Sequence, residues 1–187
     1  HSGTYQLPFA CRFVDGQCRF LAALTPLQPR YAKHGADADN LMAVIVAQAM
    51  NHGNLLMSRT SDIPYHVLQA THEQYLRQAT LRAANDCISN AIAELPIFPH
   101  YSLDLGTLYS AVDGQKFSVQ RPMVKARYSR KYFGRGKGVV AYTLLCNHVP
   151  LQGWMIGAHD FEAHHVFDVW YRNTSDIEPE VITGDMH

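Results

Sequence analysis

The sequence predicts a mixed fold, between α+β and α/β, in which a helical segment precedes a sheet-forming segment. Apolar residues recur at helical spacing from Asn40 to about His100. After Tyr101 the apolar residues gather into short runs bounded by glycine, proline and asparagine, which is the pattern of strands. These runs and one amphipathic stretch follow the order strand, strand, strand, helix, strand, so we expect a sheet with one crossover helix.

Length and composition predict a globular chain with one medium domain, or a small helical domain attached to part of a second. The 187 residues are 47% apolar and 17% charged, which is enough for a sizeable core. Four cysteines without a CxxC pair predict free thiols in a reducing cytoplasm. No apolar run reaches transmembrane length, so no membrane partner is expected.

The first part of the chain, residues 1–39, is expected to be a hairpin followed by a linker. Asp15-Gly16 is a type I′ turn signal between two short strand-like runs within Phe9–Leu21. Residues 25–38 carry two prolines and mixed polar residues, which is typical of a loop.

Residues 40–100 are expected to be a helical segment. A partly buried helix is predicted over Leu41–Met50, and a shorter helix starts near Pro64. Thr80 is the expected N-cap of a longer helix that runs through Leu95. The few charges of this segment favour packing against another domain or a partner.

Residues 101–187 are expected to form part of a sheet domain. Strands are predicted over residues 108–119, 138–146, 151–156 and 181–183, with a basic loop over 120–136. Asp160 is the expected cap of a helix that runs to about Arg172. Its predicted buried face consists of Ala163, Val166, Phe167 and Trp170.

A helix between the third and fourth strands can return the chain parallel to the first strand through a right-handed crossover. This element order resembles the opening topology of the ribonuclease H-like fold, in which the first and fourth strands are neighbours. The resemblance implies that Asp113, on the first strand, and Asp185, after the fourth, face each other across adjacent strands.

Asp113 and Asp185 are therefore the candidate catalytic and metal-binding residues. Two carboxylates on adjacent strands suit Mg²⁺, with Mn²⁺ as a substitute, because these hard cations prefer oxygen ligands. A pair of such ions can clamp the attacking and leaving oxygens of a phosphodiester. The alternative is that Asp113 is a turn residue, since Asp15 lies in the same Val-Asp-Gly-Gln sequence and is assigned to a turn.

A basic segment lies between the two aspartates, although the formal net charge of the chain is zero. From Gly114 to His159 there are eight Lys or Arg residues and no Asp or Glu. Such a segment can bind the phosphates of DNA, or it can be a solvated loop. The candidate DNA-binding residues are Lys116, Arg121, Lys125, Arg127, Arg130, Lys131, Arg135 and Lys137.

Other residues of the basic segment suggest how it is shaped. Tyr128 and Tyr132 are candidates for stacking on exposed bases. Phe133 is expected to anchor the segment to the core instead. The glycines at 134, 136 and 138 predict a tight turn or a close backbone approach.

Three stretches carry a resemblance to a known family. They are Asp113-Gly-Gln-Lys-Phe117, Lys131-Tyr-Phe-Gly-Arg-Gly-Lys-Gly138 and Gly184-Asp185. Together they resemble the catalytic region of TnpA-type transposases of replicative class II bacterial transposons, the Tn-three family. The helix Thr80-Leu-Arg-Ala-Ala-Asn-Asp86 is similar to the segment that precedes this catalytic core, so the similarity starts near Asn40.

The resemblance implies a DDE-type core that cuts transposon ends and joins the resulting 3′-hydroxyl to target DNA. Asp113 and Asp185 would be the first two acidic ligands. The third ligand, a glutamate, lies beyond Asp185 in that family, and Glu162, Glu178 and Glu180 precede Asp185. The chain lacks an initiator Met and stops two residues after Asp185, so we expect a catalytically incomplete fragment.

Two alternatives belong to other functional classes. The cluster of His159, Asp160 and His164 suggests a metal-dependent phosphohydrolase of the HD type. The helical segment suggests a non-catalytic DNA-binding or assembly module, although Arg59, Arg77 and Arg82 form no basic recognition face. Self-association as a homodimer is expected through the edge of the last strand.

Overall fold

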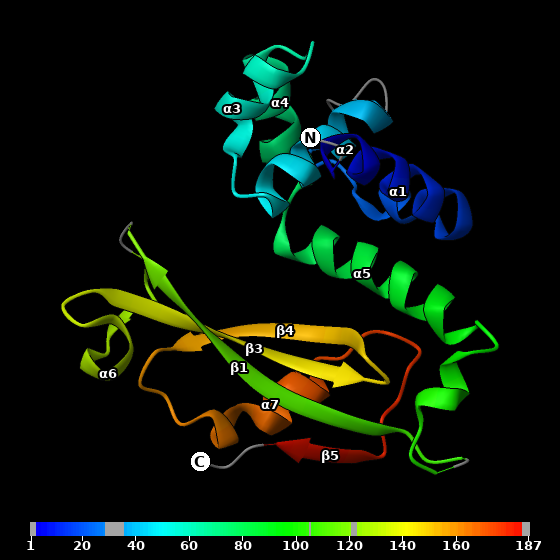
Figure 1. Ribbon diagram of the computed structural model, residues 1–187, viewed down its shortest axis with the longest axis vertical. Helices are drawn as coiled ribbons and strands as arrows, with labels where there is room; N and C mark the ends of the chain where they lie inside the picture. The colour runs from blue at the N-terminus through cyan, green and yellow to red at the C-terminus, as the bar shows by residue number, and fades with distance from the viewer. Residues whose placement is uncertain (1–2, 29–35, 105, 121–122, 185–187) are drawn as a thin grey trace. The chain divides into compact units, whose positions relative to one another are not determined.

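The computed structural model describes residues 3–28, 36–104, 106–120 and 123–184, with the backbone alone for residues 3–8 (Figure 1). The chain divides into two compact units, residues 1–91 and 92–187. Each unit has its own hydrophobic cluster. No helix of the described residues is long and apolar enough to cross a membrane.

Unit 1 is helical. It contains α1 (Gly3–Cys18), the 3-10 helix η1 (Phe20–Ala23), α2 (Ala38–Ala49), α3 (Gly53–Thr60), α4 (Tyr65–Tyr75) and α5 (Gln78–Ala93), which runs into the second unit. The prediction of a helix over Leu41–Met50 is confirmed by α2. The carboxylate of Asp37 begins this helix by accepting the N–H groups of Asp39 and Asn40.

The predicted hairpin over Phe9–Leu21 is wrong, because this stretch belongs to α1 and η1. Cys11, Val14 and Cys18 are spaced three and four residues apart, and all three pack on the cluster of unit 1. Asp15 lies in the last turn of α1 rather than at the tip of a hairpin. Its carboxylate accepts the N–H of Leu21 (2.9 Å) and thereby stabilises the exit from the helix.

Thr80 lies inside α5, so its prediction as N-cap is wrong by one turn. Its hydroxyl accepts the N–H of Arg77 (3.0 Å), the residue directly before the helix. A side chain at the third helical position that reaches back in this way performs half of a capping box. The threonine therefore correctly indicated the start of a helix, but the helix begins two residues before it.

Unit 2 contains a five-stranded sheet. The strands are β1 (Tyr109–Val119), β2 (Arg127–Tyr128), β3 (Lys137–Cys146), β4 (Val149–Gly157) and β5 (Val181–Gly184), and the 3-10 helix η2 (Phe98–Tyr101) precedes them. The order is β2-β3-β1-β5, and β4 pairs with β3. β1 and β3 are antiparallel, whereas β1 and β5 are parallel neighbours as predicted.

The predicted basic loop has secondary structure of its own. It carries the short strand β2 and the single-turn helix α6 (Arg130–Phe133). β2 pairs with the start of β3 through Arg127 and Tyr128. The segment is therefore attached to the end of the sheet (Figure 1).

The crossover from β4 to β5 is shorter than predicted. It comprises the 3-10 helix η3 (Glu162–His165) and α7 (Val166–Tyr171). Asp160 does not cap a helix. Its carboxylate accepts the N–H of Gly157 (2.8 Å) and closes the turn after β4.

The two faces of the sheet differ. One face carries Val112, Val140, Tyr142 and Leu144 and packs with Val169 of α7 into the core of unit 2. Because strand side chains alternate, Asp113, next to Val112, points to the opposite face and is exposed. The sheet thus presents Asp113 to solvent while its neighbours hold β1 in the core.

We predict that α7 is attached to the sheet mainly through Val169. This residue is fully buried, whereas Phe167, predicted on the buried face, is 64% exposed. Val169→Ala should lower the free energy of unfolding by about 1–3 kcal/mol, because it removes buried apolar surface and leaves a cavity. Phe167→Ala is the matched control on the same helix and should change it by less than about 0.5 kcal/mol. Urea unfolding that ranks the two in the reverse order would contradict this assignment.

Candidate functional site

Asp113 lies in the middle of β1, opposite Thr143 of β3. Its Oδ1 accepts the N–H of Gly114 (2.8 Å), and the side chain is otherwise open to solvent. The pairing with β3 holds the backbone of Asp113, and β5 pairs with β1 up to the preceding residue, Val112. An exposed carboxylate on a rigid strand is suited to binding a cation.

β5 lies beside β1 at this position. The parallel register pairs Val112 with Gly184, the last described residue of β5. A Cβ at Gly184 would lie 2.8 Å from Val112 Cγ2, so glycine permits the close approach of the two strands. Asp185 follows Gly184 directly in the sequence and lies outside the described residues.

Hydroxyl groups add contacts between the same two strands. Ser110 Oγ donates to the carbonyl of Val181 (3.0 Å), and Thr183 Oγ1 donates to the carbonyl of Ser110 (3.1 Å). Ser110 is buried. Both bonds involve Ser110, three residues before Asp113, and they reinforce the pairing of β1 with β5.

Lys116 forms an ion pair and a cation–π contact within unit 2. Its Nζ lies 3.1 Å from Glu162 Oε1 and 4.5 Å from the centre of the Tyr132 ring. The sequence did not mark Glu162 as a site residue, because the third acidic ligand of the resembled family follows the second aspartate and Glu162 precedes Asp185. No local pattern reveals its pairing with Lys116, since the two residues are 46 positions apart.

The pKa of the buried Tyr142 hydroxyl is raised by its surroundings. Tyr142 is paired with Gly114 in the sheet. Burial raises the pKa of its hydroxyl, and the negative charges of Glu162 and Asp113 raise this pKa further. Burial is the main cause of this shift, and the two carboxylates add to it.

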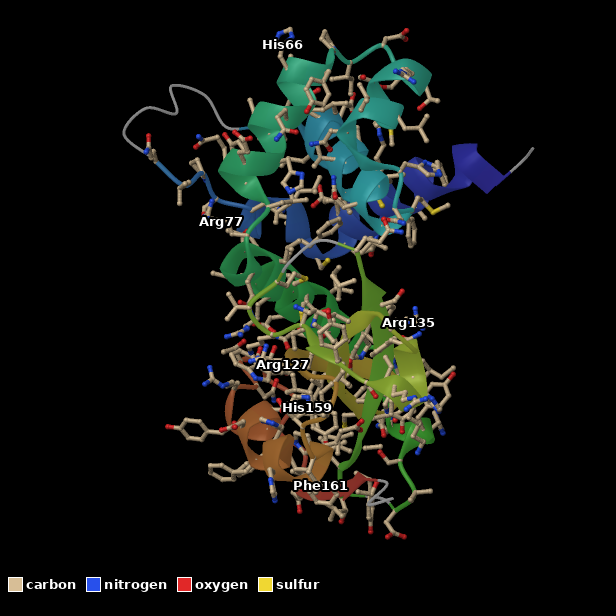
Figure 2. All side chains as sticks on the ribbon, turned by 90° about the vertical axis from the view of Figure 1, so that its left-hand side faces the viewer. His66, Arg77, Arg127, Arg135, His159 and Phe161 are labelled. Carbon is tan, nitrogen blue, oxygen red and sulfur yellow. The ribbon has the colours of Figure 1, made fainter. Side chains whose placement is uncertain are left out.

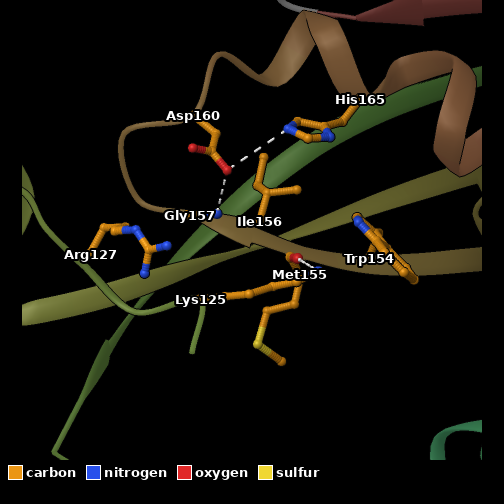
Figure 3. Close-up of a pocket in the computed structure, with 8 residues that line it drawn as sticks. All are labelled: Lys125, Arg127, Trp154, Met155, Ile156, Gly157, Asp160 and His165. Carbon is orange, nitrogen blue, oxygen red and sulfur yellow. Dashed lines mark hydrogen bonds and ion pairs between the residues drawn. The ribbon is translucent and has the colours of Figure 1, made fainter. Parts of the chain in front are cut away.

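Lys125 and Arg127 line a pocket of about 150 Å³ at the outer strand of the sheet (Figure 3). Lys125 Nζ donates to the carbonyl of Met155 (2.7 Å) and lies 4.2 Å from the centre of the Trp154 ring. Arg127 Nη1 donates to the carbonyl of Ala126 (3.1 Å). Both cations thus already have internal contacts.

The remaining predicted basic residues are more open. Arg130, Lys131, Arg135 and Lys137 are exposed, and Figure 2 shows Arg135 at the surface of unit 2. Lys131 lies 5.0 Å from the Tyr132 ring and Lys137 5.0 Å from the Tyr128 ring. Arg130 and Arg135 form no hydrogen bond or ion pair with any described residue. Arg121 lies outside the described residues.

Phe133 anchors the basic segment, as predicted. Its ring occupies the space that a Cβ at Gly138 would need, and the same Cβ would lie 2.6 Å from the carbonyl oxygen of Phe117. Gly134 follows α6 with a φ of 59°, which explains the glycine at that turn. Gly138 therefore leaves room for the Phe133 ring against β1 and β3, and Gly134 permits the turn after α6.

The histidine cluster does not form the metal site that the HD-type alternative requires. His159 and His165 approach the Asp160 carboxylate only to 4.0 and 3.9 Å. His164 is exposed and packs edge-on against Phe161. In the described part of the chain, no three His, Cys, Asp or Glu side chains gather as a metal site.

One arginine of the helical unit is held by backbone groups. Arg77 donates to the carbonyls of Gln74 and Thr25, so it ties the residue before the loop to the end of α4. All four cysteines are free thiols, as predicted.

Comparison with known proteins gives consistent matches. The family model described as "Tn3 transposase DDE domain" matches residues 11–187. The chain is 31% identical over 147 residues to "Transposase for transposon Tn4556" of Streptomyces fradiae, covering 78% of this chain and 16% of that protein. It is 28% identical over 108 residues to "Transposase for transposon gamma-delta" of Escherichia coli (strain K12), covering 57% and 10%. No solved structure matches.

We predict that Gly138→Ala detaches the basic segment from the sheet. The added Cβ meets both the Phe133 ring and a backbone oxygen, and the backbone oxygen cannot rotate away. The free energy of unfolding should fall by about 1–3 kcal/mol. Gly153→Ala is the matched control, because a Cβ there meets nothing within 4 Å. Equal urea midpoints for the two variants would contradict the packing of Phe133.

Proposed function

Because the chain belongs to the Tn3 transposase DDE domain family, we propose that Asp113 and Asp185 are the first two acidic residues of a DNA transposase site. The parallel pairing of β1 with β5 supports this most directly. It brings Gly184 beside Val112, one residue before each aspartate. The matches cover 16% and 10% of the two curated relatives, so the activity of the whole protein belongs to this proposal.

We assign unit 2 to the front part of a ribonuclease H-like domain. Three antiparallel strands, a crossover helix and a parallel strand beside the first one support this assignment. The division into residues 1–39, 40–100 and 101–187 remains our prediction for the domain organisation. We assign the helical part to support or assembly.

The donor atoms fit a divalent cation. Asp113 supplies exposed carboxylate oxygens, and no described cation pairs with them. Mg²⁺, with Mn²⁺ as a substitute, would be held by Asp113, Asp185 and a third acidic residue beyond this chain. When bound, it would supply Lewis-acid stabilisation of a phosphodiester.

The proposed reaction takes place on DNA. Water attacks the phosphorus at a transposon end, and the departing oxygen becomes a free 3′-hydroxyl. That hydroxyl then attacks the phosphorus of a target phosphodiester and becomes joined to it. The 3′-oxygen of the target strand is the leaving group, and it takes up a proton to become a 3′-hydroxyl. The protein holds the DNA, orients the reacting bond and needs no Ser or Tyr nucleophile.

We propose that the exposed cations of the basic segment contact the DNA backbone. They are Arg130, Lys131, Arg135 and Lys137. Their position on α6 and at the start of β3 places them on the segment that follows β1. Arg121, Lys125 and Arg127 belong to the same candidate surface, and the last two would have to exchange internal contacts for phosphate.

Self-association and location remain proposals. β5 pairs only with β1 among the described strands, so its other edge is available for a second copy. We expect the protein to act in a reducing cytoplasm, where bacterial DNA lies.

We predict that Asp113→Asn strongly slows strand cleavage in the full-length protein. Loss of one group that stabilises transition-state charge should lower the cleavage rate constant by about 10²–10³-fold. Cleavage of a labelled transposon-end duplex with Mg²⁺ measures this, and DNA affinity should change little. Glu178→Gln is the matched control, an exposed carboxylate of the same unit that should leave the rate unchanged.

Two outcomes would contradict the proposal. Full cleavage by Asp113→Asn would remove Asp113 from the site. DNA affinity without any cleavage by the unaltered protein would favour the non-catalytic binding module instead.

A further inference from the structure

We propose that Lys116 is a positioning residue that joins β1, η3 and α6 on the face of the sheet opposite to Asp113, and that it does not contact DNA. This inference rests on the proposed function and reassigns one of the predicted DNA-binding residues. Its basis is the pair of contacts that Lys116 makes with Glu162 and Tyr132.

The two contacts come from different elements. Glu162 begins η3, at the start of the crossover to β5. Tyr132 lies in α6, within the basic segment. The ammonium lies 3.1 Å from Glu162 Oε1 and 4.5 Å from the Tyr132 ring centre, so one cation holds both elements against β1.

Glu162 also packs directly on the strand that carries Asp113. A Cβ at Gly114 would lie 2.6 Å from Glu162 Cδ and 2.7 Å from Oε1. Gly114 therefore leaves room for the carboxylate against the β1 backbone. Gly114 follows Asp113 directly, so this contact holds the β1 backbone next to Asp113, from the face opposite to the Asp113 side chain.

The surroundings of Lys116 disfavour a phosphate contact. The side chains of Lys116 and Glu162 are 27% and 25% exposed, so both charges are partly removed from water. Binding a phosphate would require Lys116 to leave a carboxylate that would then remain partly buried without its partner. Arg130 and Arg135 face no such cost, because they form no ion pair with a described residue.

The elements joined at Lys116 are those that the proposed reaction requires. α6 carries cations proposed to bind DNA, and the crossover leads to β5 and Asp185. Losing the ion pair would let these elements shift relative to Asp113. A misplacement of about 1 Å can lower a reaction rate by about 10²-fold.

The test uses the full-length protein with Lys116→Gln, Glu162→Gln and the double variant. Single-turnover cleavage of a transposon-end duplex at saturating DNA should slow by about 10- to 100-fold in each single variant. The double variant should be no slower than the slower single variant, because the two residues act as one unit. Gly114→Ala, which displaces the Glu162 carboxylate while both charges remain, should slow cleavage in the same way.

The salt dependence of DNA binding separates positioning from contact. A lysine that neutralises a phosphate contributes about 0.9 to the slope of log affinity against log salt concentration. Lys116→Gln should leave this slope unchanged, whereas Arg135→Gln should reduce it by about 0.9. Arg12→Gln is the control for breaking an ion pair elsewhere, because its exposed pair with Asp39 lies in unit 1. It should leave the cleavage rate, the salt slope and the unfolding midpoint unchanged.

A loss of about 0.9 in the salt slope for Lys116→Gln would overturn the inference and make Lys116 a DNA contact. Unchanged cleavage in both single variants would also overturn it, as would single effects that multiply in the double variant. Full cleavage by Asp113→Asn would be a different failure, because it would remove the proposed site itself.

Discussion

The parallel pairing of β1 with β5 is the constraint on which the candidate site depends. Three strands, β2, β3 and β4, and the crossover separate these two strands in the sequence, and α7 of the crossover packs on the sheet through Val169. Val112 and Gly184 meet so closely that a side chain at 184 would collide with Val112. Hydroxyl bonds from Ser110 and Thr183 reinforce this contact. In the sequence the next residues are Asp113 and Asp185, so the proposed chemistry depends on this strand register.

The basic segment combines attachment to the sheet with exposed charge. Phe133 packs over Gly138, and Lys116 is paired with Glu162, so this part of the segment is held by apolar and ionic contacts. Arg130 and Arg135 remain open to solvent on the same short stretch. A rigid base with exposed cations can hold a phosphate backbone at a fixed distance from a carboxylate. The described basic residues of this segment therefore differ in their contacts and exposure.

The sequence predicted the sheet better than it predicted the contacts around the site. Four of the five strands were predictable along the chain because β-branched and aromatic runs bounded by turn residues are local signals. The two-residue strand β2 was not predicted, and the pairing of the first strand with the last came from the resemblance to a known fold. The hairpin over Phe9–Leu21 failed because Asp15-Gly16 is also tolerated in the last turn of a helix whose apolar positions have helical spacing. Asp160 and Phe167 were misplaced because the crossover opens with the 3-10 helix η3 and α7 starts only at Val166, so the residue that α7 buries is Val169. The ion pair between Lys116 and Glu162 could not be predicted, because the two residues are 46 positions apart and no local sequence pattern indicates it.

The central claim is that Asp113 and Asp185 share a divalent cation. The most direct measurement is the anomalous signal of Mn²⁺ in crystals of the full-length protein bound to transposon-end DNA. The account predicts an ion with carboxylate oxygens of both residues at about 2.1 Å. An ion bound elsewhere, or carboxylates more than about 10 Å apart and so beyond the span of a two-ion site, would contradict it.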